Sequence, residues 1–480
     1  MYHDTIYEVR KDGDLFSFCD DITSKAKCMY NTTNYYIRNV MTGIRKEEKD
    51  RTPNEKEVLE TVCGMIPKIN DIIKTPKHKK RSKKKKGSKE IKLPTEDKWM
   101  LSYNTLDGIF KLSDDPDYRS LPANIAQNAI KECVNEWKGY FSSLKPYKKD
   151  PTLFLGLPKI PKYKKGDHAT AVIGNQLSYV KDGMLHLPGR HTLDISGYVP
   201  DGKFIETRIS PYYNGYVIHV ITEDGITSKR SKAKGIMMID PGVNNFVSVC
   251  DNRGGVPFIV KGGFIKSRNQ WFNKKKAELT SILMKGRDPK KYRPPETRRL
   301  NALSEKRDRF LRDCFYKISH RIAREAIRRK CGTVVIGKNE LEKQNVNIGH
   351  MNDQTFVMLP IARFIGILTT VCSKYGIEVV PQEESYTSKA SALDKDDIPT
   401  YHRGDDTAYT FSGKRVKRGL YVSKNGIELN ADINGSMNIG RKYDPNVLSK
   451  VRSYDNITKK IEVLEFESFY KKESSPGKAG

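Results

Sequence analysis

The sequence has 480 residues, of which 37% are hydrophobic and 30% are charged. Lysine and arginine number 87 against 58 aspartate and glutamate, and a net charge of +29 predicts a polyanionic partner, because counterion release drives binding to nucleic acids. The sequence contains no apolar run of about 18 residues and no amphipathic basic anchor, so a membrane surface is the weaker alternative and no membrane partner is expected.

The N-terminal residues and the cysteines both indicate an intracellular protein. Residues 1–14 lack a basic region followed by an apolar stretch, so we expect no secretory signal. The eight cysteines form no CxxC pair, and several, such as Cys250 and Cys372, lie in apolar sequence. We therefore expect reduced thiols in the core rather than disulfides.

The region 18–147 is predicted to be mostly helical. Segments 31–48, 54–74 and 121–144 carry apolar residues at spacings of three and four. Between the second and third helices, residues 76–92 read PKHKKRSKKKKGSKEIK, a run of like charge that cannot pack. This basic segment is interpreted either as an RNA-contacting loop or as a nuclear localisation signal, which would place the protein in the nucleus.

Residues 148–234 are predicted to form a small antiparallel β domain. The segments HTLDISGYV, FIETRIS and GYVIHVITED alternate apolar and polar residues between turn residues. The stretch LPKIPKYKKGD comes just before them and suits an extended segment in contact with a nucleic-acid backbone. Its candidate phosphate contacts are Lys159, Lys162 and Lys164.

The pattern changes again from residue 235. GIMMID, NNFVSVCDN and PFIVKGG predict three successive strands, and a helical stretch over 267–330 follows, broken near RDPKKYRPPE. The strand TVVIG, a helix over 360–376, the strand IEVVPQEE and a helix near Asp432 complete the series. Three adjacent strands followed by alternating helices and strands indicate an α/β layer of the ribonuclease-H type.

Three acidic residues lie where these elements begin or end. Asp240 ends the first strand before Pro241, Glu384 ends the strand IEVVPQEE, and Asp432 is expected to be an N-cap. The carboxyl ends of parallel strands form a ligand-binding edge, and carboxylates suit a two-metal phosphodiester hydrolase with Mg²⁺ ions about 4 Å apart. Each acid alone is more often a turn or cap residue, but together in so basic a chain they predict a nuclease.

Five segments, in this order, resemble the RuvC-like half of TnpB: GIMMIDPGVNNFVSV, TVVIGKNELEKQNVNIG, EESYTSKAS, FSGKRVKRGLYVSKNG and NADINGSMNIGRK. They are similar in particular to the eukaryotic TnpB relatives called Fanzor, of the branch related to IS607-type TnpB. The resemblance is specific over about 235–443 and weaker before it. It implies an RNA-guided, Mg²⁺-dependent DNA endonuclease that uses an omega RNA and is related to type V CRISPR effectors.

The resemblance also implies a multidomain α+β organisation, in which a β-barrel wedge domain with a helical recognition insert precedes a ribonuclease-H-like (RuvC) nuclease domain. The expected parts are the wedge in 1–17 and 148–234, the helical recognition domain in 18–147, the nuclease in 235–385 and 429–447, a target-nucleic-acid-binding insert in 386–428, and a C-terminal tail in 448–480.

By motif, Asp240 matches the first catalytic aspartate of the family and Asp432 the last. Many TnpB proteins carry the middle glutamate after the strand TVVI, where this sequence has Gly337. Glu384 fits the rearranged glutamate of Fanzors, with Glu383 and Glu340 as lesser candidates. This assignment requires the strand IEVVPQEE to lie beside the strand IMMID.

The insert departs from relatives that hold a Cys₄ zinc finger. Residues 385–431 contain no cysteine and a single histidine, His402, so no zinc is expected. YTFSGKRVKRGLYVSKNG instead predicts a basic β-hairpin that grips a strand. The candidate phosphate or stacking contacts are Tyr386, Lys389, Lys414, Arg415, Lys417 and Arg418.

The leading prediction is an RNA-guided DNA endonuclease in which guide RNA lies on the basic N-terminal and wedge surfaces. Base pairing would select double-stranded target DNA, and the protein would read a short flanking motif. Two alternatives remain: a catalytically silent regulator that binds RNA or DNA, and a DNA transposase that uses the same carboxylates without RNA. A monomer is expected.

Overall fold

The structure is a computed structural model that describes residues 2–10, 13–74, 90–151, 154, 156–223, 231–288, 291–292, 294–338, 359–401, 407–417, 419–449, 451 and 453–470. The chain divides into two compact units, Met1–Ile226 and Thr227–Gly480. No helix in the described ranges is both long enough and apolar enough to cross a membrane.

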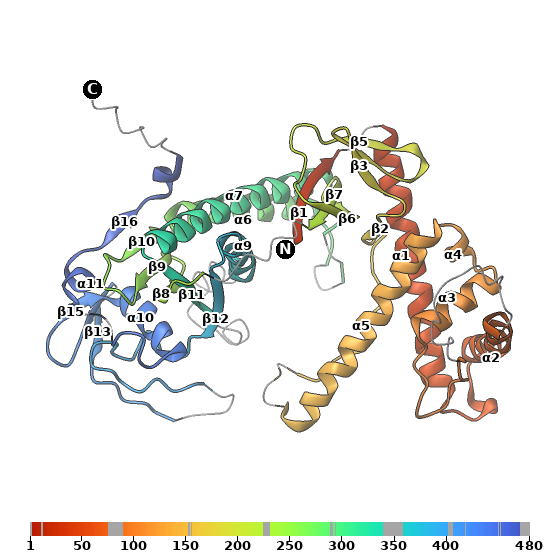
Figure 1. The fold of residues 1–480 in the computed structure, drawn as a ribbon, viewed down its shortest axis with the longest axis horizontal. Coiled ribbons are helices and arrows are strands. Elements are labelled where there is room, and N and C mark those ends of the chain that lie inside the picture. Colours follow the sequence, from red (N-terminus) through yellow and green to blue (C-terminus); the bar gives the residue numbers. More distant parts are fainter. Residues whose placement is uncertain are drawn as a thin grey trace. The chain divides into compact units, whose positions relative to one another are not determined.

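The first unit contains a four-stranded antiparallel sheet in the order β1-β7-β6-β2 (Figure 1). These strands are β1 (Tyr2–Val9), β2 (Ala171–Gly174), β6 (Lys203–Tyr212) and β7 (Gly215–Glu223). A second, three-stranded sheet contains β3 (Tyr179–Lys181), β4 (Met184–His186) and β5 (Thr192–Asp194). The strands predicted between 191 and 224 are thus confirmed, and their closure into a barrel stays a prediction.

Most of the described residues between β1 and β2 are helical. The helices are α1 (Asp14–Gly43), α2 (Pro53–Lys74), α3 (Tyr103–Leu112), α4 (Pro116–Arg119) and α5 (Ala123–Lys149). The three periodic segments form parts of α1, α2 and α5, whereas α3 and α4 were not predicted. These two are short, and each begins at a side-chain cap: Ser102 Oγ accepts from Thr105 N at 3.1 Å, and Asp115 Oδ1 accepts from Tyr118 N at 3.0 Å.

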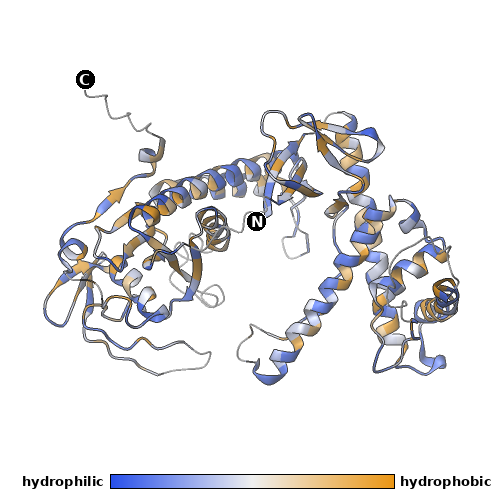
Figure 2. Ribbon diagram, in the orientation of Figure 1, coloured by the Kyte–Doolittle hydropathy of each residue, from blue (hydrophilic) through white to orange (hydrophobic). Residues whose placement is uncertain are grey.

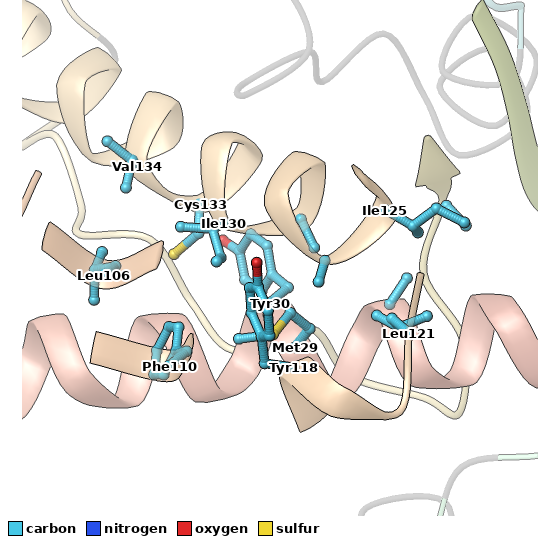
Figure 3. Packing of buried hydrophobic residues seen from close by; sticks show 14 of the residues in the cluster. Met29, Tyr30, Leu106, Phe110, Tyr118, Leu121, Ile125, Ile130, Cys133 and Val134 are labelled. Carbon is cyan, nitrogen blue, oxygen red and sulfur yellow. The ribbon is translucent and has the colours of Figure 1, made fainter. Parts of the chain in front are cut away.

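Apolar side chains from α1, α3, α4 and α5 interlock in the core of this unit (Figure 3). Tyr30 and Trp137 are among its largest fully buried side chains. The Trp137 indole still finds an acceptor, because its Nε1 donates to Asn34 Oδ1 at 3.0 Å. Orange and blue residues interleave along the long helices in Figure 2, as amphipathic helices require.

A six-stranded sheet forms the centre of the second unit, in the order β12-β11-β8-β9-β10-β16 (Figure 1). The strands are β8 (Gly235–Pro241), β9 (Asn245–Asp251), β10 (Phe258–Lys261), β11 (Cys331–Lys338), β12 (Glu378–Glu383) and β16 (Glu462–Leu464). β8, β9 and β10 pair antiparallel, while β11 runs parallel to both β8 and β12. The five predicted strands are confirmed.

The sixth strand lies in the segment that was expected to be a tail. β16 pairs parallel to β10, with Phe258 opposite Glu462, and it follows the short helix α11 (Asp455–Lys459). Phe466, just beyond β16, is 1% exposed and belongs to the same core as β8 and β10. Residues 462–464 therefore complete the sheet, a difference that the weak periodicity of a three-residue strand explains.

Helices cover both faces of this sheet. On one face, α7 (Arg298–Arg328) and α9 (Ile361–Ser373) share a core with Met237 and Ile239 of β8. On the other, α10 (Ala431–Tyr443) shares a core with Met238. Because successive strand residues point to opposite faces, Asp240 lies on the α10 side with Met238. A further helix, α6 (Gly263–Leu283), precedes α7.

All eight cysteines are free thiols, and six of them are buried. Burial raises the pKa of Cys250 to about 12, and the pKa values of other buried thiols such as Cys372 are raised in the same way. These thiols stay protonated at neutral pH and pack as small apolar side chains.

Candidate active site

Three parallel strands of the second unit end at the same edge of the sheet. In β11, Ile336 lies opposite Ile239 of β8, and Gly337 lies opposite Gln382 of β12. Asp240 follows Ile239, and Glu384 follows β12, so both acids are at this edge. The predicted neighbour relationship was nevertheless wrong: β12 does not pair with β8, because β11 lies between them.

Glu384 reaches across β11 because Gly337 has no side chain. A Cβ atom at Gly337 would overlap the Oε2 atom of Glu384 and would lie 3.2 Å from Cδ of Pro241, the residue after Asp240. It would also meet Ile439 of α10, so the Glu384 carboxylate lies on the α10 side of the sheet. Glu384 and Asp240 thus share an edge and a face although their strands are not neighbours.

Asp240 lies against the first turns of α10. A Cβ atom at Gly435 would overlap Oδ2 of Asp240, so this close approach of helix to strand requires a glycine. Gly435 is three residues after Asp432, and residues at this spacing lie on the same side of a helix. The N-terminus of α10 therefore brings Asp432 to the edge that holds Asp240.

Asp432 lies in the first turn of α10 but is not its N-cap. The cap is Asn430, whose Oδ1 accepts from Asp432 N at 2.9 Å and from Ile433 N at 3.3 Å. This corrects the expected capping role, because the Asp432 carboxylate has other partners. Asn245 Nδ2 donates to its Oδ2 at 2.6 Å, and Arg415 Nη2 lies 3.4 Å from its Oδ1.

Glu383, a lesser candidate, is engaged in a different contact. Its carboxylate forms an ion pair with Lys442 and accepts from Ser385 N at 2.5 Å. The Lys442 side chain is 5% exposed and also donates to the carbonyl oxygens of Ser385 and Pro399, at 3.2 and 3.0 Å. Glu383 therefore neutralises a buried ammonium group. The other lesser candidate, Glu340, lies outside the described residues.

The three acids fit a divalent cation by donor chemistry, since carboxylate oxygens are the ligands that Mg²⁺ prefers. Gly337 and Gly435 also leave the space that two of these carboxylates occupy, which a Cβ at either position would fill. Yet within the described parts of the chain, no three His, Cys, Asp or Glu side chains already lie close enough together to hold a metal ion. The acids share one edge without forming a preassembled cluster.

The insert after Glu384 contains a three-stranded antiparallel sheet of β13 (Lys414–Lys417), β14 (Leu420–Val422) and β15 (Glu428–Asn430). This confirms the predicted basic hairpin as a structural element. All four residues of β13 are exposed, including the candidate contacts Lys414, Arg415 and Lys417. Arg418 lies outside the described residues.

Tyr386 and Lys389 begin this insert and lie together. The Lys389 ammonium group is 5.7 Å from the centroid of the Tyr386 ring. The same ring packs edge-on against Tyr409, with centroids 5.0 Å apart, and tilted against Phe411. Lys389 is exposed and Tyr386 half-buried, so this aromatic group is partly open to a ligand.

In the first unit, the three predicted lysines have different surroundings. Lys159 and Lys162 are exposed, whereas Lys164 forms ion pairs with Glu132 at 3.0 Å and Glu136 at 2.8 Å. Its ammonium group also lies 4.3 Å from the centre of the Tyr30 ring. Partial burial alone would lower the pKa of Lys164, but the hydrogen bonds that it donates to Glu136 and Glu132 raise it. Lys164 therefore holds its own segment against α1 and α5.

Two residues of the site were missed by sequence reasoning. Gly435 carries a signal, because a glycine inside a short helix is costly and usually has a packing reason. Asn245 has no comparable signal, since one asparagine in a polar turn is unremarkable. Its contact with Asp432 joins residues 187 positions apart and becomes visible only in the fold.

Two family models match parts of the chain. Residues 219–342 match the OrfB_IS605 family, described as a probable transposase, and residues 362–439 match the TNB domain described as Cas12f1-like. The first match contains Asp240, and the second contains Glu384 and Asp432. No curated protein matches the chain.

Two solved structures are similar to the chain at 15% identity. The match with the cryo-EM structure of a Cas12f1–sgRNA–target DNA complex extends over 91% of this chain and 98% of that chain, with a TM-score of 0.29. The match with that of a CRISPR–Cas12f ternary complex extends over 85% of this chain and 81% of that chain, with a TM-score of 0.30. The family-model matches show that these two stretches of the chain are similar to the TnpB and type V effector family.

Proposed function

We propose that the protein is an RNA-guided DNA endonuclease of the Fanzor branch, with Asp240, Glu384 and Asp432 as its acidic residues. The observation that carries this proposal is the approach of these three acids to one edge of the sheet, beneath the N-terminus of α10. The family-model matches support a nuclease or transposon-derived activity.

The sheet supports a ribonuclease-H-like (RuvC) nuclease. Its strands β10, β9 and β8 are antiparallel neighbours, and β11 and β12 continue the sheet in parallel. This places the ends of β8, β11 and β12 together, as an acidic site built from separate elements requires.

In the proposed site, Asp240, Glu384 and Asp432 would hold Mg²⁺ at the end of the sheet. Bound Mg²⁺ would activate a water molecule and stabilise the leaving oxygen of a phosphodiester. The protein orients the carboxylates: Gly337 leaves space for the Glu384 carboxylate, and Gly435 leaves space for that of Asp240.

The proposed partners are a guide RNA and double-stranded target DNA. A net charge of +29 supports a nucleic-acid partner, and the exposed residues of β13 are beside Asp432, to which Arg415 extends. Specificity would come from base pairing by the guide. A monomer in the nucleus remains part of this proposal, although most of the basic segment 76–92 lies outside the described residues.

The test is DNA cleavage by the full chain purified with its bound RNA, in Mg²⁺ and in EDTA. Sequencing should find one abundant structured RNA. The variants Asp240→Ala, Glu384→Ala and Asp432→Ala should each lose cleavage while they keep the RNA. Glu428→Ala, in the exposed part of β15, is the matched control and should cut normally. Cleavage that persists in all three acid variants, or in EDTA, would contradict the proposal.

A DNA transposase is the second candidate, because the family matched over 219–342 is described as a probable transposase. It predicts joining of a transposon end to target DNA without RNA. An assay that supplies both DNAs separates the two functions: joined products after ribonuclease treatment support the transposase, and RNA-dependent cleavage without joining supports the endonuclease.

A further inference from the structure

Three side chains from three elements form a continuous chain of hydrogen bonds that ends at Asp432. Lys261, at the end of β10, donates from Nζ to Asn245 Oδ1 at 3.1 Å. Asn245, at the start of β9, donates from Nδ2 to Asp432 Oδ2 at 2.6 Å. Lys261 and Asn245 also lie opposite each other where β9 and β10 pair, so the backbone fixes the distance between them.

The orientation of the Asn245 amide follows from the chemistry of its neighbours. An ammonium group can only donate hydrogen bonds, and a carboxylate can only accept them. The amide oxygen must therefore face Lys261, and the amide nitrogen must face Asp432. An asparagine in this position serves both neighbours at once, and Lys261 polarises the amide so that its N–H becomes a stronger donor.

In this arrangement Lys261 helps to hold the Asp432 carboxylate in position without forming an ion pair with it. A direct ion pair between Lys261 and Asp432 would place a positive charge on Oδ2, in addition to that of Arg415 near Oδ1. The intervening amide transmits the position of Lys261 but carries no net charge. It also ties only Oδ2 and leaves Oδ1 facing the exposed Arg415 on the insert.

From this geometry we infer that Asn245 is a positioning residue: held by Lys261, it fixes the Asp432 carboxylate for a divalent cation. The inference rests on the proposed function, since it assigns a metal to Asp432. Partners that orient metal ligands usually contribute about 10- to 100-fold to metal affinity.

The test uses Mn²⁺ as the probe and measures its binding directly, by electron paramagnetic resonance of the free ion, on the full chain with its RNA. Asn245→Leu keeps the number and branching of the side-chain heavy atoms and removes the hydrogen bonds. It should weaken Mn²⁺ binding by about 10- to 100-fold. Lys261→Met should weaken it in the same direction but less, because the amide still donates to Asp432.

The neighbouring Asn244 supplies the matched control, because its side chain is exposed and accepts from Lys266 Nζ at 3.3 Å. Asn244→Leu should bind Mn²⁺ like the parent protein. All variants should unfold at the parent temperature in EDTA, which separates lost positioning from lost folding. Parent-like Mn²⁺ affinity of a folded Asn245→Leu variant would overturn the inference.

A double variant tests whether Asn245 acts through Asp432. In an Asp432→Ala background, Asn245→Leu should add no further loss of Mn²⁺ affinity; an equal loss with and without Asp432 would overturn the inference. Failure of the proposed function gives a different result. If the proposed function is wrong, Asp432→Ala alone would leave both Mn²⁺ binding and cleavage unchanged.

Discussion

The carboxylate of Glu384 fills the space that a side chain at Gly337 would need. A side chain at position 337 and the Glu384 carboxylate therefore cannot occupy this space together. A residue larger than glycine on β11 would displace Glu384, and Glu384 can reach this edge only over a glycine. An acidic side chain at the end of β11 and one that follows β12 can therefore bring a carboxylate to the same place in the fold. The glycine at the position where an acid was expected is therefore what allows the glutamate after β12 to reach this edge.

This relationship predicts an energetic coupling between the two residues. Gly337→Ala should reduce the free energy of unfolding by about 1–3 kcal/mol, because the added methyl group overpacks the site. In a Glu384→Ala background the same substitution should cost much less, since the carboxylate is gone. Urea denaturation of the four proteins of this cycle measures the coupling. Equal costs in both backgrounds would show that the two side chains do not compete.

The same relationship predicts a functional exchange. Glu384→Ala should lose cleavage, and adding Gly337→Glu should restore part of it, because the new carboxylate starts from the position over which Glu384 now lies. The control is Gly337→Gln in the Glu384→Ala background, which has the same size without the charge and should stay inactive. Both are read by Mg²⁺-dependent DNA cleavage. Equal activity of the Glu and Gln variants would disprove the exchange.

Gly435 gives a prediction about α10. Gly435→Ala should lower stability by about 1–3 kcal/mol and reduce cleavage, because its Cβ would displace the Asp240 carboxylate. Gly366 is the matched helical glycine in α9, and a Cβ there meets no atom within 4 Å. Gly366→Ala should be neutral or stabilise by up to about 1 kcal/mol, since alanine has the higher helix propensity. Thermal unfolding and cleavage together check both, and equal behaviour of the two variants would contradict the contact.

Hydrophobic periodicity was sufficient to predict β8 to β12 and the helix of Asp432, because buried strands and amphipathic helices leave regular patterns. It could not predict the order of the strands. The sequence places β11 before β12, but only pairing decides that β11 lies between β8 and β12. The cap of α10 illustrates a second limit: Asn430 and Asp432 are both good caps, and which one caps depends on the partners that the fold offers to Asp432.

The start of α2 makes the stability of the first unit depend on pH. Thr52 and Glu55 form a capping box, with Glu55 Oε2 accepting from Thr52 N at 2.8 Å, and Lys46 Nζ lies 2.8 Å from the same carboxylate. Burial alone would raise the pKa of Glu55, but these hydrogen bonds lower it to about 2. A lowered pKa in the folded state means that the charged form stabilises the fold.

The stabilisation by Glu55 should therefore be complete above its ordinary pKa of 4.5 and be lost as the pH falls toward 2. Glu55→Gln should cost about 1 kcal/mol at pH 7, the usual value of a lost cap, and less at pH 3. Glu60→Gln, exposed on the same helix, should change little at either pH. Urea denaturation at the two pH values tests this, and a cost that does not shrink in acid would contradict it.

Lysines of different surroundings should differ in their contribution to nucleic-acid binding. Lys417 is exposed on β13, so Lys417→Ala should leave stability unchanged and reduce the slope of log affinity against log salt by about 0.7–0.9, the value for one lost phosphate contact. Lys164 is held by Glu132 and Glu136. Lys164→Ala should instead destabilise the first unit, because the two carboxylates then repel each other, and leave the slope unchanged. Binding of DNA and of the co-purified RNA across a salt series distinguishes these outcomes; a lower slope for Lys164→Ala would show that its ion pairs open for a phosphate.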